Sequence, residues 1–316
     1  MAQVICAGVM VADVLARGVG SDVFSRDCTR VERVQIATGG DAFNQAVNLA
    51  QLGISTALLG RVGQDTAGQL LLEQARARDI DVSGVQQIAG RPTSVSIVLI
   101  GEDGQRNIIA SRAGSNGALC AADILPVKGG VRGASIYSLG SLYGSLSLTG
   151  EQAAMGLKAA KCAGMVTVAD MMHGDHPLED AALALQYVDY FLPNCEEACL
   201  LTGQEQPENA IRALLELGVG CVVLKMGGEG CLVGTGAGER LQFPACRAKV
   251  EDTTGAGDAF AAGFIWGLLE GLPVEVCALR GNAAGAVAVE CLGATCGDFT
   301  KQALLARMEE AKAVLT

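Results

Sequence analysis

The chain has 316 residues, of which half are apolar, 18% are charged and only 4% are aromatic, a composition that disfavours intrinsic disorder. Its formal net charge of −11 disfavours a sequence-independent grip on nucleic acid, which needs clustered Lys and Arg. The longest charge-free stretch, residues 42–60, contains four side-chain amides, so we expect no membrane-spanning segment.

Short apolar runs alternate along the chain with longer segments of helical spacing. This alternation predicts a mostly parallel sheet covered by helices. Glycines at 53, 218 and 271 stand just past the expected helix ends, where they favour termination. In chain order, we expect strand Val4–Val9, helices Ala42–Leu52 and Gly68–Arg78, strand Ser135–Leu139, helix Glu151–Cys162, strands Val166–Ala169 and Tyr190–Pro193, helix Glu208–Leu217, strand Cys221–Met226 and helix Asp258–Glu270.

One region departs from this alternation. Residues 92–100 and 107–111 flank the polar turn at 101–104 and predict a β-hairpin, with which alternating residues of segment 13–38 could pair. We therefore expect a small β-sheet lid inserted into the α/β body. The predicted core comprises residues 1–12, 39–90 and 114–316, and the discontinuous lid comprises 13–38 and 91–113.

The twelve cysteines are scattered through a large chain, as with Cys6, Cys162, Cys221, Cys231 and Cys291, which predicts buried free thiols in a reducing cytoplasm. The closest spacings, 195 with 199 and 291 with 296, do not match structural zinc sites. The only histidines, at 173 and 176, are expected in a solvated loop.

The strongest chemical signal is the string DTTGAGD at residues 252–258, which opens an apolar helix. Such a turn directs the amides of Gly255, Ala256 and Gly257 and the positive end of the helix dipole at one point, predicting an anion site. Beside it, Asp258 could accept a proton from an attacking hydroxyl during phosphoryl transfer. The alternative is an ordinary first-turn acid. No lysine follows a glycine, so a Walker loop is excluded.

Residues 252–264, DTTGAGDAFAAGF, resemble the C-terminal signature of the ribokinase-like (PfkB) carbohydrate kinases. Segments 38–46 and 60–65 resemble the N-terminal signature of that family, so the likeness extends over almost the whole chain. The resemblance implies a ribokinase-like three-layer α/β sandwich with a β-sheet lid. It also implies an ATP-dependent carbohydrate kinase in which Asp258 is the base.

The same resemblance implies ligands for each part of the site. ATP would be the phosphoryl donor, and Mg²⁺ and a monovalent cation, K⁺ being the candidate, would accompany it. The implied residues are Asp13, Gly39, Gly40, Asn44 and Arg112 for substrate; Asn194, Lys225, Gly228, Gly230 and Asn282 for the nucleotide; Glu197 for Mg²⁺ through water; and Asp252 and Thr254 for the monovalent cation. Taken singly, Arg112 and Asn282 fit surface residues equally well, Lys225 could point to solvent, and residues 194–197 could simply begin a helix.

The substrate is narrowed by two departures from relatives. Asp41 replaces the Lys of many ribokinases, and the segment after Asp170 lacks the Asn and Arg with which ketodeoxygluconate kinases bind a sugar acid. We therefore expect a neutral sugar first and a nucleoside second. A catalytically silent relative that binds a sugar to regulate is the alternative from another class. A homodimer joined through the lid is also expected.

Overall fold

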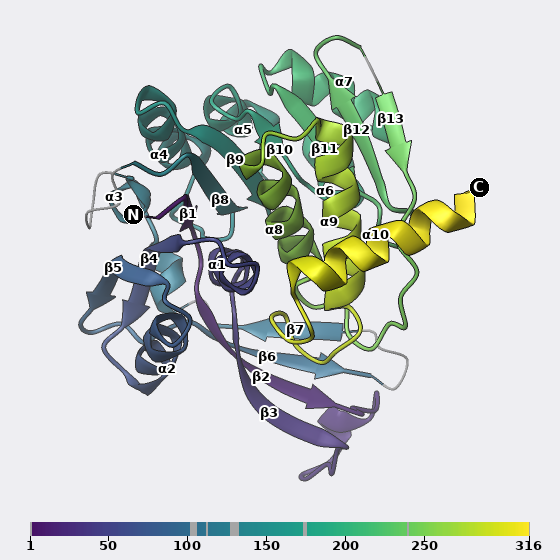
Figure 1. Cartoon of the computed structure of the whole chain (residues 1–316). Helices are drawn as coiled ribbons and strands as arrows, with labels where there is room; N and C mark the ends of the chain where they lie inside the picture. The colour runs from purple at the N-terminus through teal and green to yellow at the C-terminus, as the bar shows by residue number, and fades with distance from the viewer. Residues whose placement is uncertain are drawn as a thin grey trace.

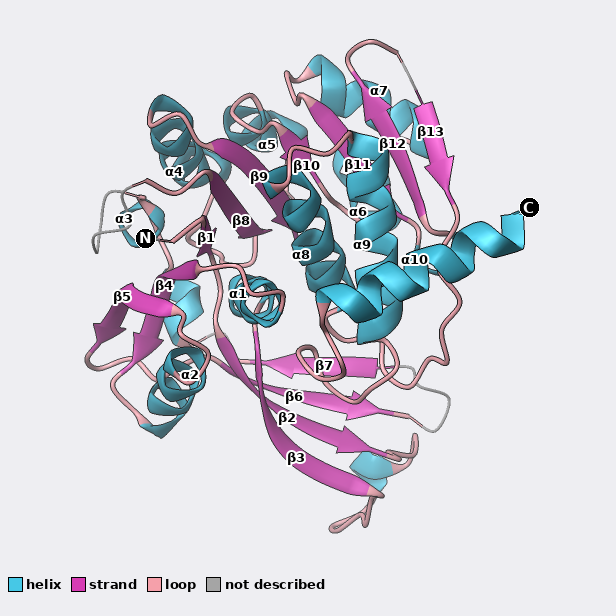
Figure 2. Ribbon diagram, in the orientation of Figure 1, coloured by secondary structure: helices cyan, strands magenta, loops and turns pink. Residues whose placement is uncertain are grey.

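The structure, a computed structural model, describes residues 2–101, 106–111, 113–126, 133–172, 176–238 and 240–315. Its centre is a nine-stranded sheet, parallel except at one edge, where β12 pairs antiparallel with both β11 and β13 (Figures 1 and 2). In sheet order the strands are β13 (Arg240–Phe243), β12 (Cys231–Thr235), β11 (Cys221–Lys225), β10 (Tyr190–Phe191), β9 (Val166–Met171), β8 (Ile136–Leu142), β1 (Val4–Ala7), β4 (Thr56–Gly63) and β5 (Asp81–Ile88).

Helices cover both faces of this sheet, and two large apolar clusters lie between the layers. In β1, Val4 and Cys6 face one cluster while Ile5 and Ala7 face the other, as the two-residue period of a strand requires. The predicted three-layer sandwich is confirmed. One face carries α1 (Asp41–Gln51), α2 (Thr66–Arg76), α8 (Ala256–Leu269), α9 (Val274–Ala288) and α10 (Lys301–Leu315); the other carries α3 (Ala121–Ile124), α4 (Gly150–Cys162), α5 (Leu178–Leu185), α6 (Cys195–Thr202) and α7 (Pro207–Glu216).

A separate sheet of four strands, here called the lid sheet, lies below α1 and α8 in Figure 1. The hairpin predicted from residues 92–111 is confirmed, since its two strands pair antiparallel. The inner pair of strands runs parallel, because the chain returns to the lid from the core between them. In sheet order the strands are β3 (Arg33–Gly39), β2 (Val11–Arg17), β6 (Val95–Ile100) and β7 (Arg106–Ala110).

The two faces of the lid sheet differ in what covers them. Leu15, Val98 and Ile100 are buried on the inner face with the core residue Leu292 packed against them. On the outer face, the side chains of the alternate positions are exposed in this chain. These outer residues include Val34, Ile36, Ile97 and Ile109, whose exposed fractions are 62%, 71%, 41% and 48%.

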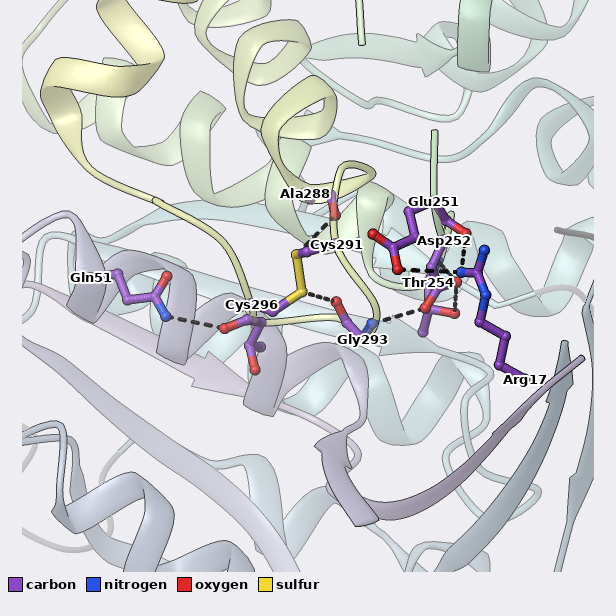
Figure 3. The surroundings of a disulfide bond; sticks show 10 residues. Arg17, Gln51, Glu251, Asp252, Thr254, Ala288, Cys291, Gly293 and Cys296 are labelled. Atoms are coloured by element: carbon purple, nitrogen blue, oxygen red, sulfur yellow. Dashed lines mark hydrogen bonds and ion pairs between the residues drawn. A yellow bond between two sulfur atoms is a disulfide. The ribbon is translucent and has the colours of Figure 1, made fainter. Parts of the chain in front are cut away.

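Of the five cysteines named in the prediction of buried free thiols, that prediction is wrong for two, Cys162 and Cys291. Cys291 and Cys296 form a disulfide, because the turn after α9 brings their Cα atoms to 6.1 Å (Figure 3). Cys162 is a free thiol but exposed, since it lies at the solvent-facing end of α4. Cys6, Cys221 and Cys231 are buried free thiols as predicted. Across the described helices, none combines the length and apolar character that crossing a membrane requires.

Candidate active site

The first feature of the site is the N-terminus of α8. Gly255 precedes the helix in the left-handed conformation, with φ of 75°, and provides no side-chain cap. A Cβ on Gly255 would lie 2.6 Å from the Cα of Ala294, so only glycine fits. The amide of Ala256 donates to the carbonyl of Thr253 at 3.3 Å. The helix dipole and the amides of the first turn make this end attractive to an anion.

Asp258 lies in the first turn of α8 and is buried, with 7% of its surface exposed. The side-chain amide of Asn44 donates to its carboxylate across 2.8 Å, joining two segments that are 214 positions apart. The predicted base and a predicted substrate residue therefore lie together. The Oδ1 atom of Asn44 is buried and has no hydrogen-bond partner within the described residues. It is an acceptor available to a hydroxyl group.

The pKa of Asp258 is raised to about 7, chiefly because burial penalises the charged carboxylate. The nearby charge of Asp170 raises the pKa further, while the hydrogen bond from Asn44 and the charge of Lys225 lower it. A carboxyl group with a pKa near 7 is suited to taking a proton at neutral pH.

Lys225 at the end of β11 forms an ion pair with Asp170 at the end of β9. Only 14% of the Lys225 side chain is exposed, so the alternative that it points to solvent does not hold. A Cβ on Gly257 would lie 3.0 Å from the Lys225 ammonium, which places this cation beside the start of α8. Sequence reasoning did not assign Asp170 a role, although its position after a buried run at a strand's carboxyl end is a signal of a site.

Asp41 is a second acid that the prediction did not assign to the site. It lies one helical turn before Asn44, on the same face of α1, and accepts a hydrogen bond from the Ser141 hydroxyl at 2.8 Å. Burial raises the pKa of Asp41 well above its usual value, and the charges of Asp258 and Asp170 add to the rise. We call Asp41, Asp170, Asp258 and Lys225 the acid cluster.

The predicted substrate residues of the lid lie at its junction with the core. Asp13 is buried on β2 and accepts a hydrogen bond from Ser96 on β6, and burial raises its pKa. A Cβ on Gly39 would lie 1.9 Å from the Asp13 carboxylate, and one on Gly40 would lie 2.6 Å from a backbone carbonyl. Both glycines are therefore required by close packing. Arg112 falls outside the described residues.

Asn194 and Glu197 form a reciprocal cap at the start of α6. The Asn194 side chain accepts from the Glu197 amide at 2.8 Å, and the Glu197 carboxylate accepts from the Asn194 amide at 2.9 Å. The backbone of Asn194 also pairs with Lys225 as an isolated parallel bridge. The negative charge of Glu197 contributes to raising the pKa of Lys225, so Glu197 interacts electrostatically with the acid cluster.

The glycines after β11 have different environments. Gly230 has φ of 92°, and a Cβ there would lie 2.0 Å from the Phe243 carbonyl, whereas one on Gly228 would meet nothing within 4 Å. Asn282 is buried, not a surface residue, and donates to the Pro244 carbonyl at 2.9 Å. We call residues 194–197, 227–230 and 243–244, together with Asn282, the nucleotide-side group, after the role predicted for Asn194, Gly228, Gly230 and Asn282.

Asp252 and Thr254, predicted to bind a monovalent cation, are bonded to each other. One carboxylate oxygen of Asp252 accepts from the Thr254 amide at 2.9 Å and hydroxyl at 2.7 Å, and the other accepts from the Gly293 amide at 2.9 Å. In the part of the chain that the structure describes, no three or more His, Cys, Asp or Glu side chains are grouped to hold a metal ion. Oxygen ligands for a cation would have to come mainly from backbone carbonyls or substrate.

His176 stacks on Tyr143, with ring centroids 3.8 Å apart and ring planes inclined by 7°. The Tyr143 hydroxyl donates to Asp180 at 3.0 Å, which fixes the ring on which the imidazole lies. The sequence predicted that His176 lies in a solvated loop. Its ring is instead packed against the protein. His173 lies outside the described residues.

Comparison with known proteins shows which family and fold the chain resembles over most of its length. The family model described as "pfkB family carbohydrate kinase" matches residues 1–300. A sugar kinase of Archaeoglobus fulgidus is 31% identical over 250 residues, which cover 78% of this chain and 96% of that protein. The ribokinase of Arabidopsis thaliana is 32% identical over 275 residues, covering 82% and 69% of the two chains. The structure of Arabidopsis thaliana ribokinase with ribose and ATP has a TM-score of 0.79 and 26% identity, covering 98% of this chain and 99% of that one.

Proposed function

Because the chain belongs to the pfkB family of carbohydrate kinases, we propose that it transfers the γ-phosphoryl group of ATP to a hydroxyl group of a neutral sugar. The observation that carries this proposal is the 2.8 Å hydrogen bond between Asn44 and Asp258. It joins the two segments that resemble the family signatures at the opening of one helix. ATP as donor is supported by the ribokinase structure that contains ribose and ATP.

Asp258 is the proposed base. Its carboxylate would take the proton of the attacking hydroxyl, while the Asn44 side chain holds the carboxylate by its amide and offers Oδ1 to a second hydroxyl. The amides of residues 255–257 and the dipole of α8 would stabilise the charge on the transferring phosphoryl group. The base and the anion site lie in one helical turn, so one bound position of the sugar would place its hydroxyl beside both the base and the phosphoryl group.

Lys225 would serve the triphosphate from its place beside Gly257. Bound Mg²⁺ would neutralise charge on the β- and γ-phosphates. Glu197 fits a water-mediated contact to this ion, because its carboxylate already caps α6 and magnesium keeps most of its waters. Asn194, Gly228, Gly230 and Asn282 form the proposed nucleotide side. A monovalent cation such as K⁺ near Asp252 and Thr254 stays a prediction.

The acid cluster supports a neutral substrate. Asp41 and Asp170 bring carboxylates close to Asp258, and among the described residues Lys225 is the one cation that forms an ion pair with them. A sugar acid or a sugar phosphate would add a further negative charge to this site at an electrostatic cost. Neutral polyols instead offer hydroxyl groups, which can donate hydrogen bonds to the carboxylates and to the Asn44 oxygen.

We also propose that the enzyme works in the cytoplasm.

A substrate panel tests the activity. We expect ADP to form with neutral sugars, and not with sugar acids, in a coupled assay with Mg²⁺ and ATP. In the variant Asp258→Asn, kcat should fall by about 10²–10⁴-fold while an ATP analogue still raises the melting temperature. Turnover of nucleosides alone would favour the nucleoside kinase. Binding of a sugar without ADP formation in any condition would favour a silent, regulatory protein.

We also propose a homodimer through the outer face of the lid sheet. That face carries exposed apolar side chains on β3, β6 and β7, and a second copy would bury them. In sedimentation we expect a dimer for the wild type and a monomer for the double variant Ile36→Glu/Ile109→Glu. Leu200→Glu changes an exposed leucine of α6, outside the lid, and should leave the dimer intact. A monomeric wild type would contradict the proposal.

A further inference from the structure

The disulfide between Cys291 and Cys296 closes a short loop between α9 and α10 (Figure 3). The loop contains Gly293, which has φ of 105° and is followed by Ala294. Both cysteines are partly exposed. The chain thus has a reducible covalent link in one turn. The effect of reducing it depends on the parts of the structure that contact this turn.

The first neighbour of this loop is the anion site. The Gly293 amide donates to Asp252, and that carboxylate also holds the Thr254 amide and hydroxyl. The backbone of Ala294 packs so closely on Gly255 that a Cβ there would lie 2.6 Å from the Ala294 Cα. Figure 3 shows Gly293 between the disulfide and Asp252. The position of the loop therefore fixes the segment that begins α8.

The second neighbour is the inner face of the lid sheet. Leu292 packs against the buried cluster of Leu15, Val98 and Ile100. A cavity of about 250 Å³ separates strand β3 and helix α2 from residues 292–296, and Cys296 is part of its lining. On the core side, the Gln51 side chain donates to the Thr295 carbonyl at 3.2 Å. One turn thus contacts α1, the lid and the anion site.

We propose that Cys291 and Cys296 are a reversible redox site, and that the disulfide holds the loop in the position that supports phosphoryl transfer. The oxidising step is exchange with a low-molecular-weight disulfide. Two protein thiols give up two electrons and form one S–S bond, while the reagent's S–S bond breaks and its two sulfurs leave as thiols carrying the two protons. A dithiol reductant reverses the step. The effect on activity rests on the proposed kinase function.

The proposal rests on the interactions that would hold the loop in place once the disulfide is reduced. The remaining constraints are the Gly293 and Gln51 hydrogen bonds and the packing of Leu292 and Ala294. Releasing the link restores conformational freedom to a turn with glycines at 293 and 297, both with positive φ. In a reducing compartment, disulfides are usually transient and redox-sensing. A partly exposed pair that supports an active-site turn fits that use.

Peptide mapping with activity tests the proposal. Trypsin would release residues 281–301 as one peptide containing Cys291 and Cys296 and no other cysteine. In protein treated with a low-molecular-weight disulfide, we expect this peptide to resist alkylation until a dithiol is added. As the two cysteines become available for alkylation, kcat/KM for ATP should fall about tenfold or more, since small displacements of catalytic groups are costly. Hydrogen exchange of residues 252–257 should become faster in parallel.

Two variants provide the controls. Cys291→Ser/Cys296→Ser should have the activity and the exchange rates of the reduced wild type and should not respond to the reductant. Cys162→Ser removes an exposed free thiol at the end of α4 and should respond like the wild type. A melting temperature measured for each variant separates local loosening of the loop from loss of the fold.

Contrary results are distinct from failure of the kinase proposal. Alkylation of both cysteines after disulfide treatment would overturn the redox site, as would equal activity and equal exchange of residues 252–257 in the two states. Absence of phosphoryl transfer in both states would count against the kinase. The redox site would then be decided by the peptide and the exchange rates alone.

Discussion

The acid cluster lies at the opening of α8, and the nucleotide-side group adjoins it through the bridge between Asn194 and Lys225, but the two groups use their polar side chains differently. In the acid cluster, the buried carboxylates of Asp170 and Asp258 lie near the partly buried Asp41, and the pKa values of all three are raised. In the nucleotide-side group, Asn194 and Glu197 cap each other, and Asn282 bonds the carbonyls of residues 243–244. The acid cluster therefore carries electrostatic strain, whereas the polar side chains of the nucleotide-side group have hydrogen-bond partners within the protein.

The nucleotide-side group therefore contains residues that stabilise the fold, and the acid cluster contains residues that destabilise it. Buried like charges destabilise a protein, so their presence requires another reason, and proton transfer beside a bound phosphate supplies one. A satisfied cap stabilises a helix whether or not a ligand binds. Variants of the acid cluster should therefore change charge balance and chemistry together. Variants of the nucleotide-side group should separate stability from binding.

Breaking the Lys225 ion pair should give the largest change in stability. Lys225→Met leaves the Asp170 carboxylate buried without its cation, and we expect a loss of about 3–5 kcal/mol in the free energy of unfolding. The double variant Asp170→Asn/Lys225→Met removes both charges and should recover most of that loss. Urea denaturation of the three proteins measures the effect. Equal stability of the single and double variants would show that the pair does not balance the cluster.

The pH dependence should sharpen the comparison, because stability and activity should change in opposite directions. Asp258 has a folded pKa of about 7, above its ordinary value of 3.8, so its protonated form favours the folded state. From pH about 4 to about 7, its contribution therefore destabilises the fold progressively. Over the same range kcat/KM should rise as the base ionises, by about tenfold per pH unit well below the pKa, and level off above it.

Asp258→Asn is the matched variant for this prediction. It cannot ionise, so the fall in stability between pH about 4 and 7 should be smaller than in the wild type, with the remainder coming from Asp13, Asp41 and Asp170, whose pKa values are also raised. Thermal unfolding across pH measures it. An identical pH dependence of stability in the two proteins would show that Asp258 has an ordinary pKa.

The alternation of apolar runs and helical segments was enough to predict a mostly parallel sheet covered by helices, because buried parallel strands leave a strong signal. Strands β4, β5, β12 and β13 were not predicted. β4 is buried but contains Gly60, Arg61 and Gly63. β5 and β13 lie toward the sheet edges and mix polar with apolar residues, and β12 contains Gly234. The segment containing Asp258 could be identified because a glycine turn that opens a helix forms an anion site, and the segment containing Asn44 was identified by its resemblance to the family signature.

The contacts of the site could not be predicted in the same way. Asp170 and Lys225 are 55 positions apart, and only the order of strands in the sheet brings them together. The Cys291–Cys296 bond depends on the conformation of one turn. Whether Asn194 caps a helix or contacts a ligand is not determined by the residue type, since both uses need the same amide. Sequence predicts candidates, and topology decides their neighbours.

Replacing Asn194 should give the smallest change in stability and separates its two possible uses. Asn194→Ala removes the cap of α6 and should cost about 1 kcal/mol, whereas Asn194→Ser keeps an oxygen acceptor and should cost a few tenths. Both variants lack the amide NH₂ group, so both should raise KM for ATP severalfold if that group contacts the nucleotide, as roughly 1 kcal/mol of a lost hydrogen bond implies. Steady-state kinetics beside urea denaturation distinguishes the cases. A KM unchanged in both variants would assign Asn194 to the helix cap alone, and the nucleotide would then be held by groups nearer to Lys225.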